Sequence, residues 1–172
     1  MTALRIYIGL GSNLGDRLAT LRQAVRAIAA LEGVELRACS SPWETSPLGP
    51  GSGPFLNAAL ELLSFRDPPA LLDALLSIEV AAGRVRRERW GDRTLDLDML
   101  CAFDQAGEER TLPGPLHLPH PGVVHRDFVL RPLLELAPQL CVDGRSCADW
   151  LAALPVGERT VLHRLDDPLW MR

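Results

Sequence analysis

The sequence contains no lysine, so all 18 of its basic residues are arginine. This absence excludes two kinds of site, the phosphate-binding loop that depends on a lysine and the Schiff-base centre. Acidic residues outnumber basic ones, which gives a net charge of −4. Proteins that bind nucleic acid through its phosphates carry a broad basic surface. We therefore expect no nucleic-acid partner.

Long apolar runs are also missing, since none approaches the roughly 18 residues that a membrane-spanning helix needs. The chain does not open on a charged segment followed by an apolar one, as a signal peptide would. These absences predict a cytoplasmic protein with no membrane contact. Cys39, Cys101, Cys141 and Cys147 form no CxxC pair and show no metal-ligand spacing. We expect reduced thiols, two or three of them in the core.

The order of predicted elements indicates the fold class. Apolar periodicity predicts strands and helices alternating as β-α-β-β-α-β, over residues 4–10, 15–31, 34–44, 55–65, 68–82 and 94–103. This order is typical of the ferredoxin-like arrangement, an α+β fold in which helices cover an antiparallel sheet. We expect an additional C-terminal hairpin and helices, with a short hairpin within 104–118. A length of 172 residues fits a single domain over residues 1–172.

Residues 83–103 hold the densest charge in the chain. Five arginines crowd into ten residues, and two aspartates follow with one residue between them, in the order Arg84, Arg86, Arg87, Arg89, Arg93, Asp96 and Asp98. Strand alternation predicts that both aspartates share one face, with Cα atoms about 7 Å apart. It predicts that the apolar residues of this strand share the other face, namely Leu95, Leu97, Met99, Cys101 and Phe103.

Two interpretations of this stretch remain open on the residues alone. Enzymes that transfer phosphoryl groups combine arginines, which bind phosphate oxygens, with aspartates, which hold metal ions. Charge-dense turns leading into an edge strand with a polar outer face are also common.

Two glycine-rich segments carry weaker signals. The segment Gly9–Gly15 follows the first strand, and it is either ordinary strand-to-helix turn chemistry or a loop that contacts a ligand. Read as a dinucleotide-binding loop, it would pair with Glu32 or Glu35 on the ribose and make the chain an oxidoreductase. Residues 45–54 are rich in glycine and proline and form either a linker or a wall of a pocket.

Several blocks spread along the chain together resemble the 6-hydroxymethyl-7,8-dihydropterin pyrophosphokinase family. The resemblance covers nearly the whole length, and its most specific block is Arg-Trp-Gly-Asp-Arg-Thr-Leu-Asp-Leu-Asp. In chain order, the blocks occupy residues 8–16, 44–50, 55–59, 83–86, 89–98, 118–121 and 126–133.

The resemblance implies transfer of the β,γ-diphosphoryl group of ATP to the hydroxymethyl oxygen of the pterin, with release of AMP. By this resemblance, Asp96 and Asp98 hold two Mg²⁺ ions, and Arg84 and Arg93 are the catalytic arginines. ATP-binding positions are matched by Glu79, Arg86, Trp90, His120 and Arg126.

The resemblance also implies a pterin site and a monomeric enzyme. The pterin ring would lie between Phe55 and Phe128, and Asn57 would bind its polar edge. Backbone groups between Thr45 and Leu48 would help to bind that edge.

Asp92 stands where the family usually has proline, and we expect it to loosen the approach of Arg93. An alternative from another class is a non-catalytic RNA-binding module, because ferredoxin-like sheets also bind RNA. The acidic balance and the single tyrosine count against that alternative.

Overall fold

The computed structural model describes residues 2–47, 53–83 and 92–170. Its helices are α1 (Arg17–Ala29), α2 (Pro68–Ala81), α3 (Asp127–Leu136) and α4 (Cys147–Ala153), with short 3₁₀ turns η1 (Val123–His125) and η2 (Val156–Glu158). The strands of the main sheet are β1 (Leu4–Ser12), β2 (Val34–Cys39), β3 (Trp43–Thr45), β4 (Phe55–Ser64), β5 (Asp96–Phe103) and β8 (Val161–Arg164). A separate small hairpin consists of β6 (Cys141–Val142) and β7 (Arg145–Ser146).

The main sheet is antiparallel, with the strand order β5-β1-β4-β3-β8 and with β2 also paired to β4. The longest strands, β1 and β4, lie side by side at its centre over nine paired positions, from Leu4 with Ser64 to Ser12 with Leu56. The predicted ferredoxin-like α+β fold is confirmed by this order.

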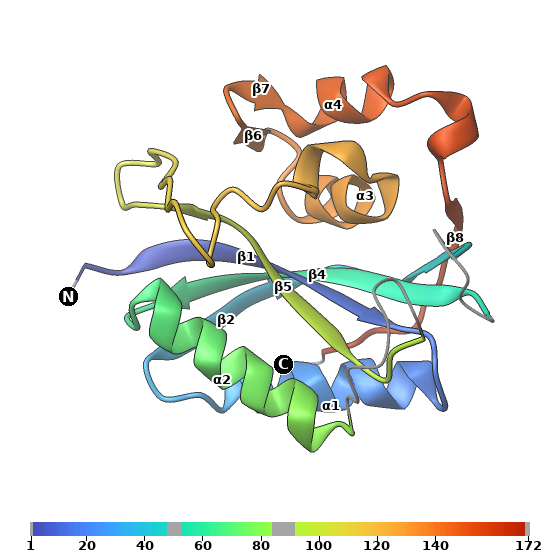
Figure 1. Cartoon of the computed structure of the whole chain (residues 1–172), viewed down its shortest axis with the longest axis horizontal. Coiled ribbons are helices and arrows are strands. Elements are labelled where there is room, and N and C mark those ends of the chain that lie inside the picture. The colour runs from blue at the N-terminus through green and yellow to red at the C-terminus, as the bar shows by residue number, and fades with distance from the viewer. Residues whose placement is uncertain (1, 48–52, 84–91, 171–172) are drawn as a thin grey trace.

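The sheet has an apolar core on each face. Helices α1 and α2 cover one face, and α3 and α4 cover the other (Figure 1). Each of the first two helices begins at an aspartate whose side chain accepts a backbone hydrogen bond: Asp16 from Ala19 N at 3.0 Å and Asp67 from Ala70 N at 3.1 Å. Such caps satisfy amide groups that have no partner within the helix.

The single strand predicted over 34–44 is divided in two. Strand β2 pairs with the second half of β4 and β3 pairs with its first half, which leaves Ser40 to Pro42 between them. Ser40 bridges the gap because its N–H donates to the Ala59 carbonyl while its hydroxyl accepts from the Ala59 N–H, both at 2.9 Å. Proline has no N–H to continue the ladder, which explains the break.

The predicted alternation along β5 fails after Met99. Tyr7 faces Cys101 and Ile8 faces Met99, so Leu100 is an extra residue in a β-bulge. Leu97 and Met99 therefore face the α1–α2 core as predicted, whereas Cys101 and Phe103 join the α3–α4 core. The bulge reverses the alternation, and the prediction of one continuous apolar face was wrong for those two residues.

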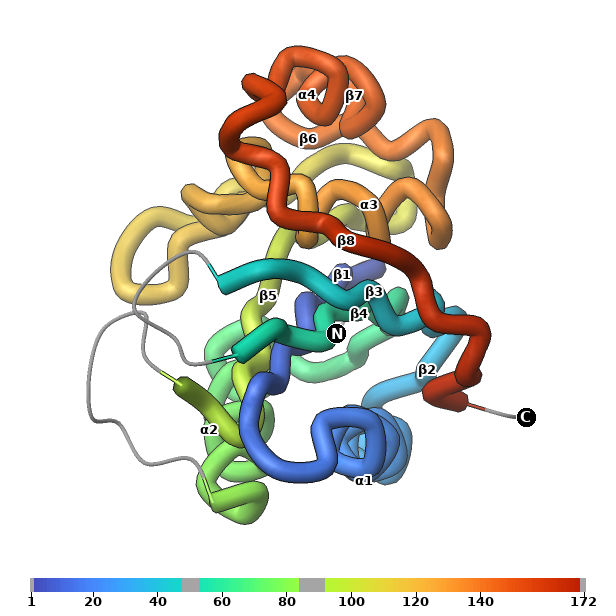
Figure 2. Tube along the Cα trace, turned by 90° about the vertical axis from the view of Figure 1, so that its right-hand side faces the viewer, coloured from blue at the N-terminus to red at the C-terminus, as the bar shows by residue number. Residues whose placement is uncertain are grey.

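The C-terminal segment, here residues 155–170, completes one edge of the sheet, and the sequence patterns gave no prediction for it. Strand β8 lies beside β3, where Thr45 pairs with Val161 (Figure 2). The chain then crosses to the α1 side of the sheet, where Leu169 enters the core and the Pro168 carbonyl accepts from Arg22 Nε at 3.0 Å.

The hairpin predicted within 104–118 is not a regular one. Only isolated bridges, Phe103 with Glu109 and Leu112 with Leu118, connect this part of the described chain. The regular C-terminal hairpin is β6–β7, which lies between α3 and α4 in the sequence.

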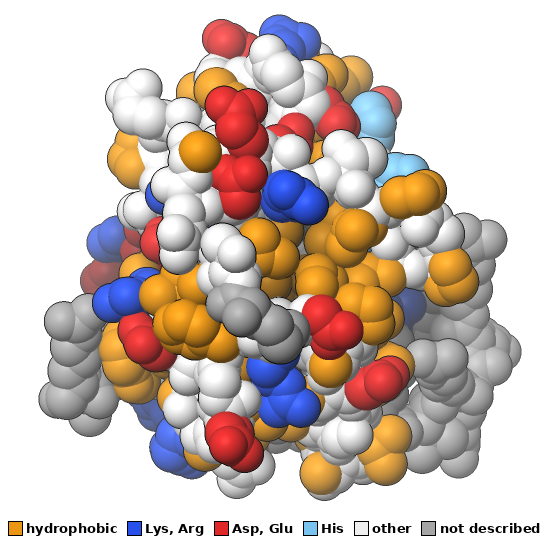
Figure 3. Space-filling model, turned by 90° about the vertical axis from the view of Figure 1, so that its left-hand side faces the viewer, with side chains coloured by type: hydrophobic (Ala, Val, Ile, Leu, Met, Phe, Trp, Pro, Cys, Tyr) orange, Lys and Arg blue, Asp and Glu red, His pale blue; other side chains and the backbone are white. Residues whose placement is uncertain are grey.

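Within the described ranges, no helix is long and apolar enough to cross a bilayer. On the face shown in Figure 3, apolar side chains gather at the centre and are surrounded by interspersed acidic and basic ones. No patch of one charge covers that face.

The four cysteines differ in exposure, which leads to a simple test of the fold. Cys101 and Cys147 are buried, Cys39 is half-buried and Cys141 is exposed, as free thiols. Burial raises the pKa of the Cys39 and Cys147 thiols to about 12, and burial also raises that of Cys101. Because the thiolate is the nucleophile, buried thiols with a raised pKa react slowly.

We therefore expect Ellman's reagent at pH 8 to modify Cys141 rapidly and the other three thiols only after unfolding. A Cys141→Ser variant should lose the rapid reaction of the native protein, and its three remaining thiols should still react once the protein is unfolded. Two or more fast thiols in the native protein would contradict this arrangement of the cysteines.

Candidate active site

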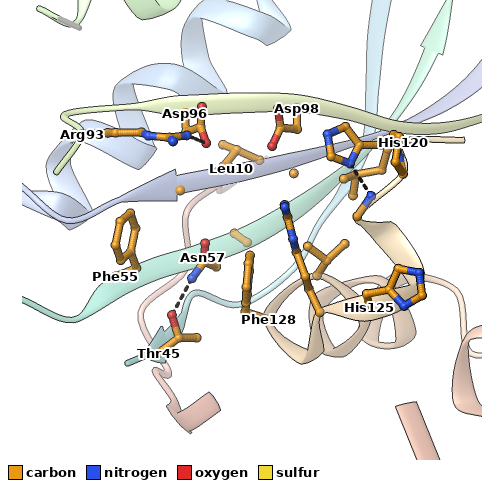
Figure 4. A pocket seen from close by; sticks show the side chains of 18 of the residues that line it. Leu10, Thr45, Phe55, Asn57, Arg93, Asp96, Asp98, His120, His125 and Phe128 are labelled. Carbon is orange, nitrogen blue, oxygen red and sulfur yellow. Dashed lines mark hydrogen bonds and ion pairs between the residues drawn. The ribbon is translucent and has the colours of Figure 1, made fainter. Parts of the chain in front are cut away.

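A cavity of about 670 Å³ opens on the α3 side of the sheet. Its walls come from β1, β3, β4 and β5 and from Arg93 just before β5. Residues between 120 and 129, before and at the start of α3, complete them. Figure 4 shows the aspartates of β5 along one side of the cavity and the aromatic side chains of β4 and α3 along the other.

Two glycines of β1 keep the floor of this cavity open. Gly9 and Gly11 both line the cavity, and a Cβ atom on Gly11 would lie 3.1 Å from Asn57 Oδ1 and 3.9 Å from the Asp96 Cβ. Both glycines lie inside the strand, which continues to Ser12, whereas the turn before α1 falls at Gly15, with φ of +63°. Because glycine has no side chain, Gly9 and Gly11 leave space that forms part of the cavity.

Asp96 and Asp98 project from alternate positions of β5, both on the cavity side (Figure 4). Burial raises the pKa of Asp98, and the adjacent Asp96 carboxylate raises it further, although three nearby basic side chains act in the opposite direction. Two carboxylates this close repel each other, and a cation bound between them would relieve the repulsion. Behind the strand, the buried Glu79 carboxylate accepts from the N–H of Leu97 at 2.6 Å and holds the backbone between the two aspartates.

Arg93 reaches the cavity from the segment before β5 and donates from Nη1 to Oδ2 of Asp96. Its backbone is held by Asn13: the Arg93 N–H donates to Asn13 Oδ1 at 2.7 Å, and the Asn13 N–H donates to the Arg93 carbonyl at 3.1 Å. The Asn13 amide nitrogen donates to Asp92 Oδ1 at 2.6 Å. The structure contradicts the expectation that Asp92 loosens Arg93, because its carboxylate orients the amide that holds Arg93.

His120 and Arg126 close the cavity on the α3 side. The Gly122 N–H donates to His120 Nδ1 at 3.0 Å, so a neutral His120 carries its proton on Nε2. Burial lowers the His120 pKa, and the Arg126 charge also lowers it, although Asp98 raises it. The Arg126 guanidinium passes over Gly122, where a Cβ would lie 2.6 Å from its Cζ, and lies 5.8 Å from the centre of the Phe128 ring.

The remaining wall is aromatic with one amide at its base. Phe55 of β4 and Phe128 of α3 lie on either side of Asn57 (Figure 4). Asn57 is 8% exposed, and its amide nitrogen donates to the Thr45 hydroxyl at 2.7 Å. This bond orients the amide and directs its oxygen toward Gly11 and the cavity. A flat ring with polar edge groups suits such a slot.

Nine of the predicted site residues line this one cavity, namely Thr45, Phe55, Asn57, Arg93, Asp96, Asp98, His120, Arg126 and Phe128. Glu79 does not line it; the predicted nucleotide contact of Glu79 stays a prediction, and the side chain instead bonds to β5. Leu48, Arg84, Arg86 and Trp90 lie outside the described residues.

Ser46, within the predicted stretch between Thr45 and Leu48, also lines the cavity. Several other lining residues were not among the predicted site residues, namely Leu100, His125 and Val129. The alternation that puts Asp96 and Asp98 on one face of β5 puts Leu100 on that face as well, so a local signal existed for Leu100. A usable signal existed for His125, since it stands directly before the block of the family resemblance that begins at Arg126.

Chemically, the cavity combines two carboxylates with arginine and histidine donors at one side and an aromatic slot at the other. Hard cations such as Mg²⁺ are bound in proteins through one or two carboxylates together with substrate phosphates and water. Among the described residues, no group of three or more His, Cys, Asp or Glu side chains is arranged as a metal cage. The pair of aspartates therefore fits a metal ion that is held jointly with a phosphate ligand.

The comparisons with known proteins agree with this geometry. The family model for 7,8-dihydro-6-hydroxymethylpterin-pyrophosphokinase (HPPK) matches residues 7–138. A 2-amino-4-hydroxy-6-hydroxymethyldihydropteridine pyrophosphokinase of Methylorubrum extorquens is 44% identical over 153 residues, which cover 87% of this chain and 93% of the relative. The protein of the same name from Pseudomonas aeruginosa is 43% identical over 153 residues, with 88% and 92% covered.

Solved structures support the fold independently of close sequence similarity. A crystal structure of HPPK-DHPS in complex with substrates superposes with a TM-score of 0.65 at 11% identity, over 89% of this chain and 43% of that one. Plasmodium falciparum HPPK-DHPS with pterin gives a TM-score of 0.63 at 11% identity, over 88% and 44%. The chain thus spans less than half the length of these solved chains.

The geometry around His120 leads to a prediction for the ligand-free protein. Since Nδ1 accepts a backbone N–H and burial lowers the pKa, we expect a neutral Nε2–H ring that protonates only below its ordinary pKa of about 6.5. Imidazole ¹⁵N shifts recorded from pH 5 to 8, assigned with a His120→Gln variant, measure both properties. A proton on Nδ1 at neutral pH, or an apparent pKa above 6.5, would contradict the geometry described.

Proposed function

This chain belongs to the 7,8-dihydro-6-hydroxymethylpterin-pyrophosphokinase family and is a pyrophosphokinase of folate biosynthesis, and we propose that the cavity beside β5 is where it acts. There it transfers the β,γ-diphosphoryl group of ATP to the hydroxymethyl oxygen of 6-hydroxymethyl-7,8-dihydropterin and releases AMP. One observation carries this proposal: Asp96 and Asp98 face the same cavity as the slot between Phe55 and Phe128. The phosphate end and the ring end of the two substrates can thus meet in one space.

The two aspartates are proposed to hold two Mg²⁺ ions together with the phosphates of ATP. The raised pKa of Asp98, caused by burial and by the charge of Asp96, supports this role, because a divalent cation would offset both effects. When bound, the ions neutralise phosphate charge and keep the attacking and leaving oxygens in line. Glu79 contributes from behind by holding the Leu97 amide between the two ligands.

The basic side chains are proposed to stabilise the diphosphoryl group as it moves. Phosphoryl transfer needs little covalent help from the protein, and most of the catalysis is positioning and electrostatic stabilisation. Arg93 lies against Asp96, with its backbone held by Asn13, and its planar fork suits phosphate oxygens. His120 in its Nε2–H form can donate one hydrogen bond to phosphate. The charge of Arg126 interacts with the carboxylates of Asp98 and Asp96.

For four residues outside the described ranges the proposal rests on the family resemblance alone. Arg84 would be the second catalytic arginine, Arg86 and Trp90 would contact ATP, and Leu48 would contribute a backbone group to the pterin site. The direct contact of Glu79 with the nucleotide is kept as part of the same resemblance.

The pterin ring is proposed to stack between Phe55 and Phe128. Because the Asn57 nitrogen donates to Thr45, the Asn57 oxygen is the atom oriented toward a donor on the ring. A buried amide that is already held by one bond loses little freedom when it binds the ligand.

The dinucleotide-binding alternative is not favoured. It needed a glycine turn that ends a strand and opens a helix, whereas Gly9 and Gly11 lie within β1, between two antiparallel neighbours. The RNA-binding alternative is not favoured by the family match.

We propose further that residues 1–172 act as one domain and as a monomer. The support is that one chain supplies carboxylate, basic and aromatic residues of the described cavity. The cytoplasmic location and the lack of a nucleic-acid partner stay predictions.

The metal assignment predicts a large loss of turnover from either aspartate. Asp96→Asn and Asp98→Asn keep the side-chain shape but remove the charge, and each should lower kcat by at least about 10²-fold. AMP is quantified by ion-exchange chromatography after mixing with ATP, Mg²⁺ and the pterin. Asp73→Asn, on the exposed side of α2, is the matched control and should leave AMP formation unchanged.

Near-normal AMP formation by either cavity variant would refute the metal assignment. ADP instead of AMP from the unsubstituted protein would refute diphosphoryl transfer. Thermal unfolding of each variant separates loss of chemistry from loss of fold.

The glycine floor predicts a selective loss of pterin binding. Gly11→Ala places a methyl group 3.1 Å from Asn57 Oδ1, and one unwanted carbon in a tight site should weaken pterin binding about tenfold or more. Gly157→Ala adds the same methyl group where no atom lies within 4 Å and serves as the control. Fluorescence titration measures the affinity; unchanged binding by Gly11→Ala would show that the pterin does not use this floor.

A further inference from the structure

One buried carboxylate has no part in the chemistry proposed above. Asp127 is the first residue of α3, it is 2% exposed, and it stands between Arg126 and Phe128, which both line the cavity. Burying a carboxylate is costly unless hydrogen bonds compensate for the lost water. The partners of Asp127 therefore indicate what it does.

All the partners described for its side chain come from the C-terminal segment. Asp127 Oδ2 accepts from Thr160 N at 2.7 Å and from Val161 N at 2.8 Å, and Oδ1 accepts from the Thr160 hydroxyl at 2.7 Å. Hydrogen bonds to an ionised acceptor are shorter and stronger than neutral ones. This carboxylate thus fixes the start of β8 against the first turn of α3.

The same two residues are in turn bonded to the opposite wall of the cavity. The Thr160 carbonyl accepts from the Ser46 N–H at 2.8 Å and from the Ser46 hydroxyl at 3.3 Å, while Val161 pairs with Thr45. Thr45 then accepts the hydrogen bond that orients Asn57. A continuous series of bonds therefore runs from α3 through β8 to the amide at the base of the slot.

We propose that Asp127 is a positioning residue for the pterin site, acting through Thr160. It sets the spacing between Phe128 on α3 and the β3 wall that carries Thr45 and Ser46, and with it the orientation of Asn57. The aspartates and Arg93 lie across the cavity on and before β5 (Figure 4), and the series of bonds described here does not include Arg126. The effect therefore falls on the pterin rather than on the phosphates. The identity of the ligand rests on the function proposed above.

The test removes one bond of the series and then restores it. Thr160→Val deletes the hydroxyl donor but keeps both backbone donors, and Thr160→Ser keeps the hydroxyl. We expect Thr160→Val to raise the Kd and KM for 6-hydroxymethyl-7,8-dihydropterin about tenfold, the effect of losing one hydrogen bond to a charged group. The Kd for ATP and kcat should change less than about twofold, since the bond that is removed involves neither β5 nor Arg126. Thr160→Ser should restore pterin affinity.

Two further variants define the comparison. Thr111→Val makes the same replacement at an exposed position outside the cavity and should change neither affinity. Asp127→Asn should reproduce the Thr160→Val phenotype more strongly; if it does not fold, the Thr160 pair still decides the question.

The inference is overturned if Thr160→Val binds the pterin as tightly as the unsubstituted protein. It is equally overturned if ATP and pterin affinities fall together or if Thr160→Ser restores nothing, because a general loss of structure would do this. If the unsubstituted protein binds no pterin, the proposed function fails first and the ligand named here fails with it.

Discussion

The repulsion between Asp96 and Asp98 is the constraint on which the rest of the site depends. Two carboxylates on one face of a strand are tolerated only where cationic groups or a metal ion offset them. Several groups in the chain offset this repulsion. Arg93 bonds to Asp96 and has its backbone held by Asn13, and the charges of His120 and Arg126, from the segment before α3, act on Asp98. The fold brings these groups together because β1, between β4 and β5, carries the floor of the cavity.

The ring end of the cavity follows a different principle, in which space is made by leaving side chains out. Larger side chains in place of Gly9 and Gly11 would extend into the gap between β5 and the aromatic wall. The groups around that gap are held by hydrogen bonds within the protein, from Asn57 to Thr45 and from Ser46 to Thr160. A slot fixed before the ligand arrives loses less entropy on binding.

Much of this arrangement follows from local sequence rules. Three features depend on residues close together in the chain: the helix caps at Asp16 and Asp67, the alternation of β5 up to Met99, and the sequence of helices and strands along the chain. Local rules failed where a partner strand intervened, because the bulge at Leu100 is a property of the β1–β5 register. The break between β2 and β3 did have a local signal, since Pro42 has no N–H to continue the ladder.

By itself, the sequence determined the ferredoxin-like element order, the pair of aspartates on one strand face and the dispersed residues that resemble the pyrophosphokinase family. These features depend on periodicity and on residue identity, which a chain displays before it folds. Only the tertiary structure decided that Glu79 supports β5 from behind, that Asp92 holds Asn13, and that Thr160 connects Asp127 to Ser46. The partners in these contacts are separated by 18 to 114 positions. Contacts at such separations form only when packing brings the segments together, and no local pattern of residue types predicts them.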